Sequence, residues 1–167
     1  MKKLLFIPLA TGLFLLAVVF IYIKLNSPLV TQTAASDTDG EILVIDTGNK
    51  GFQEINIEEV MINDGIRPAE LKIQVSNPLE GYVVTDNFDQ YAGDYIIKDL
   101  EEVSLEPGTS PIKQMEKVNS GTATEDDISY GLSIVNDEPI TEVVIKYRYL
   151  GFDFRKTVPA DTIPINQ

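Results

Sequence analysis

The feature that most constrains this chain is an alternation of apolar and polar residues with a period of two, which dominates from Glu41 onward. Within Glu70–Ser76, the side chains of Leu71, Ile73 and Val75 fall on one side of an extended chain, with polar side chains on the other. This is the pattern of a strand with one buried face. Similar runs, separated by turn-forming residues, cover 41–46, 54–63, 128–135, 141–149 and 152–158. The sequence therefore predicts an all-β domain of antiparallel strands over residues 41–160.

One of these runs changes phase in its middle. Ile55 and Ile57 are odd-numbered apolar residues, whereas Val60 and Ile62 are even-numbered, and the change falls at Glu58-Glu59. One extra residue in a strand lets the apolar side chains on both sides of it face the core. We therefore expect a β-bulge, or a bend between sheets, at this point.

One segment carries the signals of a short helix. Ser110 is a suitable N-cap, Pro111 suits the first turn, Ile112 and Met115 are three residues apart, and Gly121 is a stop signal. These signals predict a helix near 111–119, and an irregular crossing loop is the alternative.

The C-terminal strands carry a basic cluster, which consists of Lys146, Arg148, Arg155 and Lys156. A two-residue turn at Leu150-Gly151 would pair Tyr149 with Phe152, Arg148 with Asp153, Tyr147 with Phe154, and Lys146 with Arg155. One face of this hairpin would then be aromatic and the other charged. The charged face is either a solvated surface behind a core-facing aromatic stripe, or a docking patch for an acidic protein or an envelope polymer.

Three short motifs resemble those of bacterial extracytoplasmic immunoglobulin-like domains. They are Leu-Lys-Ile-Gln-Val-Ser-Asn-Pro, Val-Ser-Leu-Glu-Pro-Gly and the closing hairpin Glu-Val-Val-Ile-Lys-Tyr-Arg-Tyr-Leu-Gly-Phe-Asp-Phe, and together they extend over residues 54–158. The chain departs from antibody-type domains because it has neither Cys nor Trp. The resemblance implies an immunoglobulin-like β-sandwich and no particular activity.

The N-terminal segment Leu4–Ile23 is uncharged and mostly apolar. As a helix it would be ~30 Å long, which is the thickness of the hydrocarbon core of a bilayer. The best small-x-small cleavage site, Thr33-Ala34-Ala35, lies too far downstream for a typical signal peptide, and there is no cysteine for lipidation. We therefore expect residues 1–24 to be a retained transmembrane anchor, and a cleaved signal peptide is the alternative.

The flanking charges predict the orientation. Lys2 and Lys3 precede the apolar segment and Lys24 alone follows it, so we expect the N-terminus in the cytoplasm and the remainder of the chain outside it. Residues 25–40 are small and polar without an apolar period, which predicts a flexible tether between the membrane and the domain. Residues 161–167 are expected to be a C-terminal tail.

The exported part is strongly acidic. It carries all 26 Asp and Glu residues against 10 of the 13 Lys and Arg residues, a net charge of −16. Nucleic acids require a basic surface, so we expect no nucleic-acid binding. The charge is typical of a solvated surface, and an acidic ligand-binding face is the alternative.

The composition offers little for catalysis. The chain has no His and no Cys, which removes the usual general base, the thiol nucleophile and the commonest metal ligands. A Ser–Lys dyad and the carboxylate pairs Glu58/Glu59, Glu101/Glu102 and Asp126/Asp127 remain as weak catalytic alternatives. The acidic stretches Asp37–Glu41 and Asp86–Asp94 could bind calcium, but neither has the spacing of a calcium-binding loop. We therefore expect no catalytic, cofactor or metal site.

These patterns favour a single-pass, membrane-anchored binding, accessory or scaffold protein of a bacterial cell envelope. The membrane and a protein or envelope polymer are the expected partners. A calcium-stabilised ligand-binding module and an envelope hydrolase that uses carboxylates are the alternatives.

Overall fold

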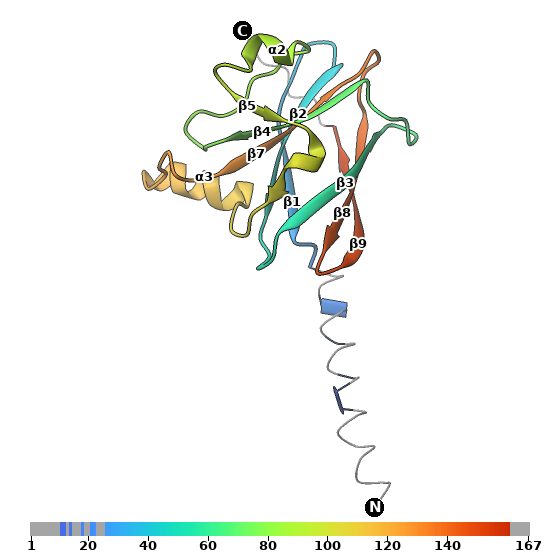
Figure 1. The fold of residues 1–167 in the computed structure, drawn as a ribbon, viewed down its shortest axis with the longest axis vertical. Coiled ribbons are helices and arrows are strands. Elements are labelled where there is room, and N and C mark those ends of the chain that lie inside the picture. The colour runs from blue at the N-terminus through green and yellow to red at the C-terminus, as the bar shows by residue number, and fades with distance from the viewer. Residues whose placement is uncertain (1–10, 13, 15–17, 19–20, 23–25, 161–167) are drawn as a thin grey trace, which may run out of the picture.

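The computed structural model describes residues 11, 12, 14, 18, 21, 22 and 26–160, and the described part from residue 26 onward folds into two antiparallel β-sheets with two short α-helices (Figure 1). Five strands form the first sheet in the order β1-β2-β7-β4-β5, and four form the second in the order β6-β3-β8-β9. Their bounds are β1 Leu29–Ser36, β2 Ile42–Asn49, β3 Ile55–Ile62, β4 Glu70–Ser76, β5 Ile96–Lys98, β6 Ser104–Leu105, β7 Ser129–Val135, β8 Glu142–Tyr149 and β9 Phe152–Pro159. The all-β prediction is thereby confirmed.

The inner faces of the two sheets share one hydrophobic core. Ile45, Ile73 and Leu132 enter it from the five-stranded sheet, and Ile57 and Ile145 enter it from the four-stranded sheet. Alternate residues of a strand point to opposite faces, so the period of two in the sequence supplies the apolar side of each sheet. The core is built from aliphatic side chains, tyrosines and Phe154, and it contains no disulfide.

The predicted bulge and hairpin are both present. The register of β3 against β8 shifts between Ile57 and Glu59, which keeps Ile57 and Val60 both buried. The β8–β9 hairpin has the predicted pairs, including Tyr147 with Phe154. Leu150 and Gly151 both have positive φ, as a type I′ turn requires.

The predicted helix is also confirmed. α3 covers Pro111–Ser120, with Pro111 in its first turn and Gly121 as a left-handed C-cap (φ 67°). Ser110 occupies the N-cap position, although its side chain makes no capping hydrogen bond. α3 contacts β1 and β2, and it lies on the side of the five-stranded sheet that faces away from the core (Figure 1).

The prediction of a flexible tether over residues 25–40 is wrong for most of its length. Residues Leu29–Ser36 form β1, an edge strand that pairs with β2 along its whole length, and Leu29 is fully buried. The segment lacks an apolar period because its outer face is exposed and its stability comes from backbone hydrogen bonds to β2. These bonds are independent of side-chain polarity, so the pattern could not reveal them.

Shorter elements were not predicted. They are α2 (Phe88–Tyr91), the 3₁₀ turn η1 (Leu100–Glu102), β5 and β6, and all of them lie between β4 and β7. None contains enough residues to display a period.

Among the residues that the structure describes, no helix is both long enough and apolar enough to cross a bilayer. The predicted anchor, residues 1–24, and the predicted tail, residues 161–167, lie outside the described residues except for 11, 12, 14, 18, 21 and 22.

Candidate functional site

The predicted basic cluster makes contacts within the chain. Lys146 Nζ lies 2.6 Å from Glu59 Oε2, and its hydrogen bond holds the pKa of the Glu59 carboxyl below its usual value. Arg148 pairs with Glu58 at 2.8 Å and with Asp153 at 3.2 Å. Two of the four cations are therefore neutralised by carboxylates on β3 and β9.

The other two cations lie on β9. Lys156 Nζ donates to the Leu29 carbonyl at 2.9 Å, and burial, with Lys50 nearby, lowers the Lys156 pKa. Arg155 is exposed and has no described ion pair or hydrogen bond. The structure thus brings the four residues onto one hairpin, but it leaves only Arg155 without a described partner; docking at this cluster stays a prediction.

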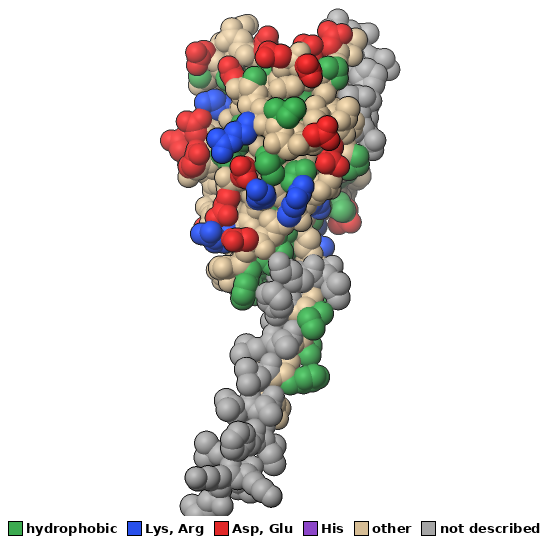
Figure 2. All heavy atoms as spheres, turned by 90° about the vertical axis from the view of Figure 1, so that its right-hand side faces the viewer, with side chains coloured by type: hydrophobic (Ala, Val, Ile, Leu, Met, Phe, Trp, Pro, Cys, Tyr) green, Lys and Arg blue, Asp and Glu red, His purple; other side chains and the backbone are tan. Residues whose placement is uncertain are grey.

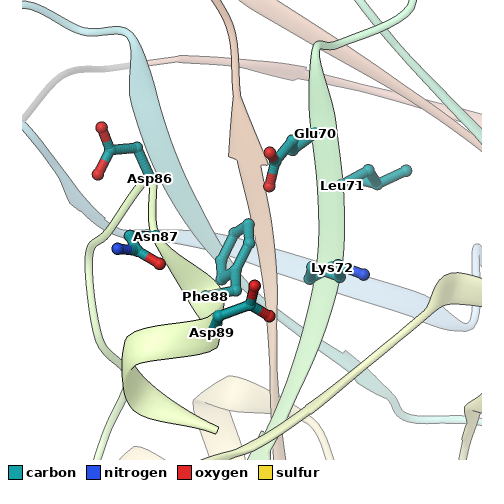
Figure 3. Close-up of a pocket in the computed structure, with 7 residues that line it drawn as sticks. All are labelled: Glu70, Leu71, Lys72, Asp86, Asn87, Phe88 and Asp89. Atoms are coloured by element: carbon teal, nitrogen blue, oxygen red, sulfur yellow. The ribbon is translucent and has the colours of Figure 1, made fainter.

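Residues 86–89, which we call the acidic loop, line one side of a shallow depression, and β4 lines the other (Figure 3). Its carboxylates come from Glu70, Asp86 and Asp89, and in Figure 3 the Asp86 carboxylate points away from that of Glu70, while the Phe88 ring lies between the loop and β4. Asn87 caps α2 by accepting from the Gln90 N–H. In the described part of the chain, no three acidic side chains are grouped in a way that could hold a metal ion.

The carboxylate pairs named as catalytic alternatives have structural contacts. Glu102 accepts from the Asp99 N–H at 3.2 Å in a capping box, and Asp127 forms an ion pair with Lys117 of α3. Both Glu58 and Glu59 form ion pairs with cations of β8. These contacts give Glu58, Glu59, Glu102 and Asp127 a structural role, and Glu101 and Asp126 are exposed.

A more informative site lies on the outer face of the five-stranded sheet. Asp46 of β2 is opposite Gly131 of β7, and Ser129 is two residues from Gly131 on the same face of β7. Neighbours on one face of adjacent strands lie within side-chain reach of each other. On the side away from the core, the sheet therefore presents the Asp46 carboxylate, the Gly131 backbone, which has no side chain, and the Ser129 hydroxyl.

The segment that follows β4 crosses this outer face. Gln74 holds it with two hydrogen bonds to Val83: Nε2 donates to the Val83 carbonyl at 2.7 Å, and the Val83 N–H donates to Oε1 at 2.9 Å. The Tyr82 ring packs over Gly131, where a Cβ atom would come within 2.6 Å of it. Its hydroxyl donates to Asp46 Oδ1 at 2.9 Å.

Together with α3, this crossing segment encloses a pocket of about 170 Å³, which we call the α3 pocket. Its residues are Asp46, Asn77, Pro78, Gly81, Tyr82, Pro111, Gln114, Met115, Val118 and Ser129. The walls are formed mainly by apolar side chains and a tyrosine ring, and the polar atoms come from few residues. This is the general composition of a small-molecule site.

Two buried polar side chains of the α3 pocket have an atom without a hydrogen-bond partner in the described chain. Gln114 is 5% exposed and its Oε1 atom has no partner, while its Nε2 donates to the Ile128 carbonyl at 2.9 Å. Ser129 is 4% exposed, and its Oγ also has no partner of normal geometry, although it is close enough to Tyr82 to affect the Tyr82 pKa. A buried polar atom without a hydrogen-bond partner lowers the stability of the fold by about 1–3 kcal/mol. Such atoms are rare in proteins and often belong to a site that binds a further group.

The α3 pocket also shifts the ionisation of Asp46. Burial raises the pKa of the Asp46 carboxyl to about 6, against the smaller opposing effect of the hydrogen bond from Tyr82. Burial also raises the Tyr82 pKa, with the neighbouring carboxylate as the next cause. A shifted carboxyl group in a pocket is a recognised sign of a functional site.

The sequence pattern does not predict the α3 pocket. Asp46 ends a predicted strand, and Ser129 and Gly131 lie inside another. Gly131 was the one available signal, because a glycine inside a strand often marks a place where another part of the chain approaches closely. Nothing in the pattern indicates that Tyr82 is that part.

No family model matches this chain, and comparisons with curated proteins and with solved structures find no match.

Proposed function

We propose that this protein is a single-pass membrane protein of a bacterial cell envelope whose immunoglobulin-like β-sandwich lies outside the cytoplasm and acts by binding, as an accessory or scaffold protein. The strand order supports the immunoglobulin-like assignment. Immunoglobulin domains have the orders A-B-E-D and C-F-G in their two sheets. Here β1-β2-β7-β4 and β3-β8-β9 follow these orders, if residues 77–128 are an insertion between strands D and E.

The observation that carries the membrane assignment is the position of β1. It begins at Leu29, six residues after the predicted span ends at Ile23, so the start of β1 lies within ~20 Å of the end of the span. The best cleavage site, Thr33-Ala34-Ala35, lies inside β1, where Thr33 and Ala35 pair with β2. Cleavage there would remove most of an edge strand from the folded domain, which favours a retained anchor.

The end of the domain where β1 begins is the end nearest the N-terminal segment (Figure 1), and it exposes apolar side chains. The Lys50 N–H donates to the Pro28 carbonyl at 2.9 Å, which holds the loop 50–54 beside the start of β1. Phe52 in this loop is 69% exposed, and Leu150 and Phe152 of the β8–β9 turn are also exposed. We call Phe52, Leu150 and Phe152 the apolar tip. Exposed Phe and Leu side chains can bury their apolar surface at the boundary between the lipid head groups and the acyl chains.

The distribution of charge agrees with this orientation. On the face shown in Figure 2, acidic side chains dominate the end of the domain far from the N-terminal segment, and Lys and Arg side chains lie nearer to it. An anionic bilayer surface repels carboxylates and attracts cations, so this arrangement suits a domain that stands with the apolar tip toward the lipid.

Binding is favoured over catalysis by the contacts described above. In each carboxylate pair named from sequence, at least one member is held in an ion pair or a helix cap, and the α3 pocket has two buried polar atoms without a described hydrogen-bond partner.

The absence of cysteine allows a direct test of the topology. Asp126→Cys places a thiol in an exposed turn of the domain, and Lys3→Cys places one before the apolar segment. In intact cells or spheroplasts, a membrane-impermeant maleimide should label the first variant and not the second. Both should be labelled after the membrane is opened, and both proteins should fractionate with membranes.

Two results would contradict the proposal. One is protection of Asp126→Cys in intact cells together with labelling after lysis, which would place the domain in the cytoplasm. The other is recovery of the full chain in the soluble fraction.

A further inference from the structure

Three side chains of the α3 pocket, Asp46, Gln114 and Ser129, can each accept a hydrogen bond. Asp46 receives one hydrogen bond from Tyr82, and no other described group bonds to its carboxylate. The Gln114 amide is fixed by its bond from Nε2 to the Ile128 carbonyl, because the reverse orientation would set two oxygens against each other. Its Oε1 is therefore the free end, and the Ser129 hydroxyl is a third acceptor.

No described cation of the chain neutralises Asp46. On α3, Lys117 forms an ion pair with Asp127 and none with Asp46. A partly buried carboxylate without a cation is unfavourable, and burial keeps its pKa near 6. The carboxylate gains most from a ligand that brings a positive charge.

The walls of the α3 pocket restrict the remainder of the ligand. Met115 and Val118 of α3, with Pro78 and Pro111, form apolar walls around the acceptors. The volume of about 170 Å³ is below the ~300–1,000 Å³ that is typical of drug-sized ligands, so the pocket suits a single side chain or a small molecule. An ammonium group has three donors and no acceptor, which matches a set of three acceptors.

We propose that the α3 pocket binds a primary ammonium group carried on a short aliphatic stem, with Asp46, Gln114 and Ser129 as its acceptors. The same chemistry occurs in a free small amine and in a lysine side chain of a partner. This inference rests on the proposed function only for the statement that the domain acts by binding.

The methionines provide a direct readout. The chain has three, and of these Met115 lines the α3 pocket, whereas Met61 lies in β3 of the other sheet. The full chain, labelled with ¹³C in its methionine methyl groups and held in detergent micelles, is titrated with n-butylammonium chloride and separately with Nα-acetyl-lysine methylamide. The Met115 methyl signal should shift and saturate, and the Met61 signal should stay in place.

The two probes distinguish the source of the ligand. Saturation by n-butylammonium supports a pocket that takes free amines, and saturation by the lysine derivative alone supports a side chain of a partner. n-Butanol has a similar stem without the charge and should produce no saturable shift. No Met115 shift with either amine, or equal shifts with the alcohol, would overturn the proposal.

A pair of variants tests the role of the carboxylate. Asp46→Asn keeps the size of the side chain and removes its charge, and it should weaken amine binding at least tenfold, because charge-assisted hydrogen bonds are about twice as strong as neutral ones. Asp86→Asn changes the net charge equally at an exposed site outside the α3 pocket and should leave binding unchanged. Equal weakening in both variants would show that the amine responds only to the overall charge.

These results are independent of the topology test. Failure of the titration with correct labelling of Asp126→Cys would remove the ligand assignment and leave the membrane assignment intact. A saturable Met115 shift together with protection of Asp126→Cys in intact cells would remove the membrane assignment and leave the ligand assignment intact.

Discussion

Asp46 shows how one residue can reduce stability at neutral pH. Burial raises its pKa from 3.8 to about 6, so the folded protein holds the proton over a pH range in which the unfolded chain has released it. For an acid with a raised pKa, stability therefore falls as the pH rises from about 4 to about 6 and stays low above that range. The cost at pH 7 is up to about 3 kcal/mol, since one pKa unit corresponds to about 1.4 kcal/mol.

Asp46→Asn should therefore stabilise the protein at pH 7 and have little effect at pH 4. The amide oxygen still accepts from Tyr82, and no charge has to be buried. Urea denaturation at several pH values between 4 and 7.5 measures the difference. Asp127→Asn is the matched control and should have the opposite effect, destabilisation at pH 7. The hydrogen bond from Lys117 lowers the Asp127 pKa, so the charged carboxylate stabilises the folded protein at neutral pH, and the amide loses that stabilisation. Equal stability of Asp46→Asn and the parent protein at pH 7 would contradict the assignment.

Two glycines on β2 and β7 should respond differently to the same substitution. A Cβ atom at Gly48 would lie 1.9 Å from the Thr109 carbonyl oxygen, which is backbone, whereas at Gly131 it would lie 2.6 Å from the ring of Tyr82, which can turn aside. Gly48→Ala should thus be the more destabilising change, and Gly131→Ala should cost ~1–3 kcal/mol as an overpacked site does. Gly93→Ala, with nothing within 4 Å, is the control for thermal denaturation. Equal costs at Gly48 and Gly131 would show that the obstacle at Gly48 also moves.

At the scale of elements, the β8–β9 hairpin separates packing from charge. Tyr147 is 1% exposed, its ring stacks on that of Phe154 with centroids 5.3 Å apart, and its hydroxyl lies 2.8 Å from that of Ser27. The opposite face carries Lys146 and Arg155, which are directly paired across the strands. The aromatic face therefore contributes to stability, and the charged face contributes mainly to surface properties.

Tyr147→Ala should cost ~3–5 kcal/mol, as truncation of a large buried aromatic side chain does. Arg155→Glu should change the free energy of unfolding by less than ~0.5 kcal/mol, because no described group pairs with this exposed side chain. Lys146→Glu should cost more than Arg155→Glu, since it replaces an ion pair with two neighbouring carboxylates. Chemical denaturation measures all three, and a large cost for Arg155→Glu would reveal a contact that supports the fold.

The same Arg155→Glu variant tests the predicted docking cluster. If the hairpin docks an acidic partner, capture from membranes should weaken, and the loss should be greatest at low salt, where charges are least screened. Lys98→Glu, which reverses a charge on β5 of the other sheet, is the control. Unchanged capture at every salt concentration would show that the cluster is only a solvated face.

The elements that the sequence predicted are those whose pattern is local. The hairpin register follows from a two-residue turn and the alternation around it, the bulge follows from the phase change at Glu58-Glu59, and α3 follows from its caps. Strand β1 has no such signal, because an edge strand with a polar surface needs only a partner strand. The α3 pocket was also unpredictable, since it joins Asp46, Tyr82 and Gln114 from three separate segments of the chain.

At the scale of the whole molecule, the segment between β4 and β7 is what distinguishes this domain from a simple pair of sheets. Residues 77–128 contribute Tyr82, which crosses the outer face of the five-stranded sheet, and α3, which closes the pocket. The same segment carries α2 and the acidic loop at the end of the domain opposite the apolar tip (Figure 1). The two sheets thus form the framework, and the segment 77–128 supplies the surface on which a ligand could be recognised.

Retention of the N-terminal segment can be read from the mass of the mature protein. If the anchor is retained, the intact mass of the protein purified from membranes should include residues 4–23, because cleavage after Thr33-Ala34-Ala35 would remove most of β1. That loss would also remove Leu29 from the core, the hydrogen bond from Lys156 to the Leu29 carbonyl, and the contact between Tyr147 and Ser27. It would expose the edge of β2, and an uncovered strand edge favours aggregation.

Two truncated proteins test this argument directly. A protein that begins at Asn26 keeps β1 and should unfold cooperatively, whereas one that begins at Ser36 should lose several kcal/mol of stability or aggregate, because a buried leucine alone contributes ~2–5 kcal/mol. Thermal denaturation and size-exclusion chromatography compare the two. If the protein that begins at Ser36 is as stable as the one that begins at Asn26, then β1 is dispensable, and a mature chain that starts at Ser36 becomes compatible with the fold.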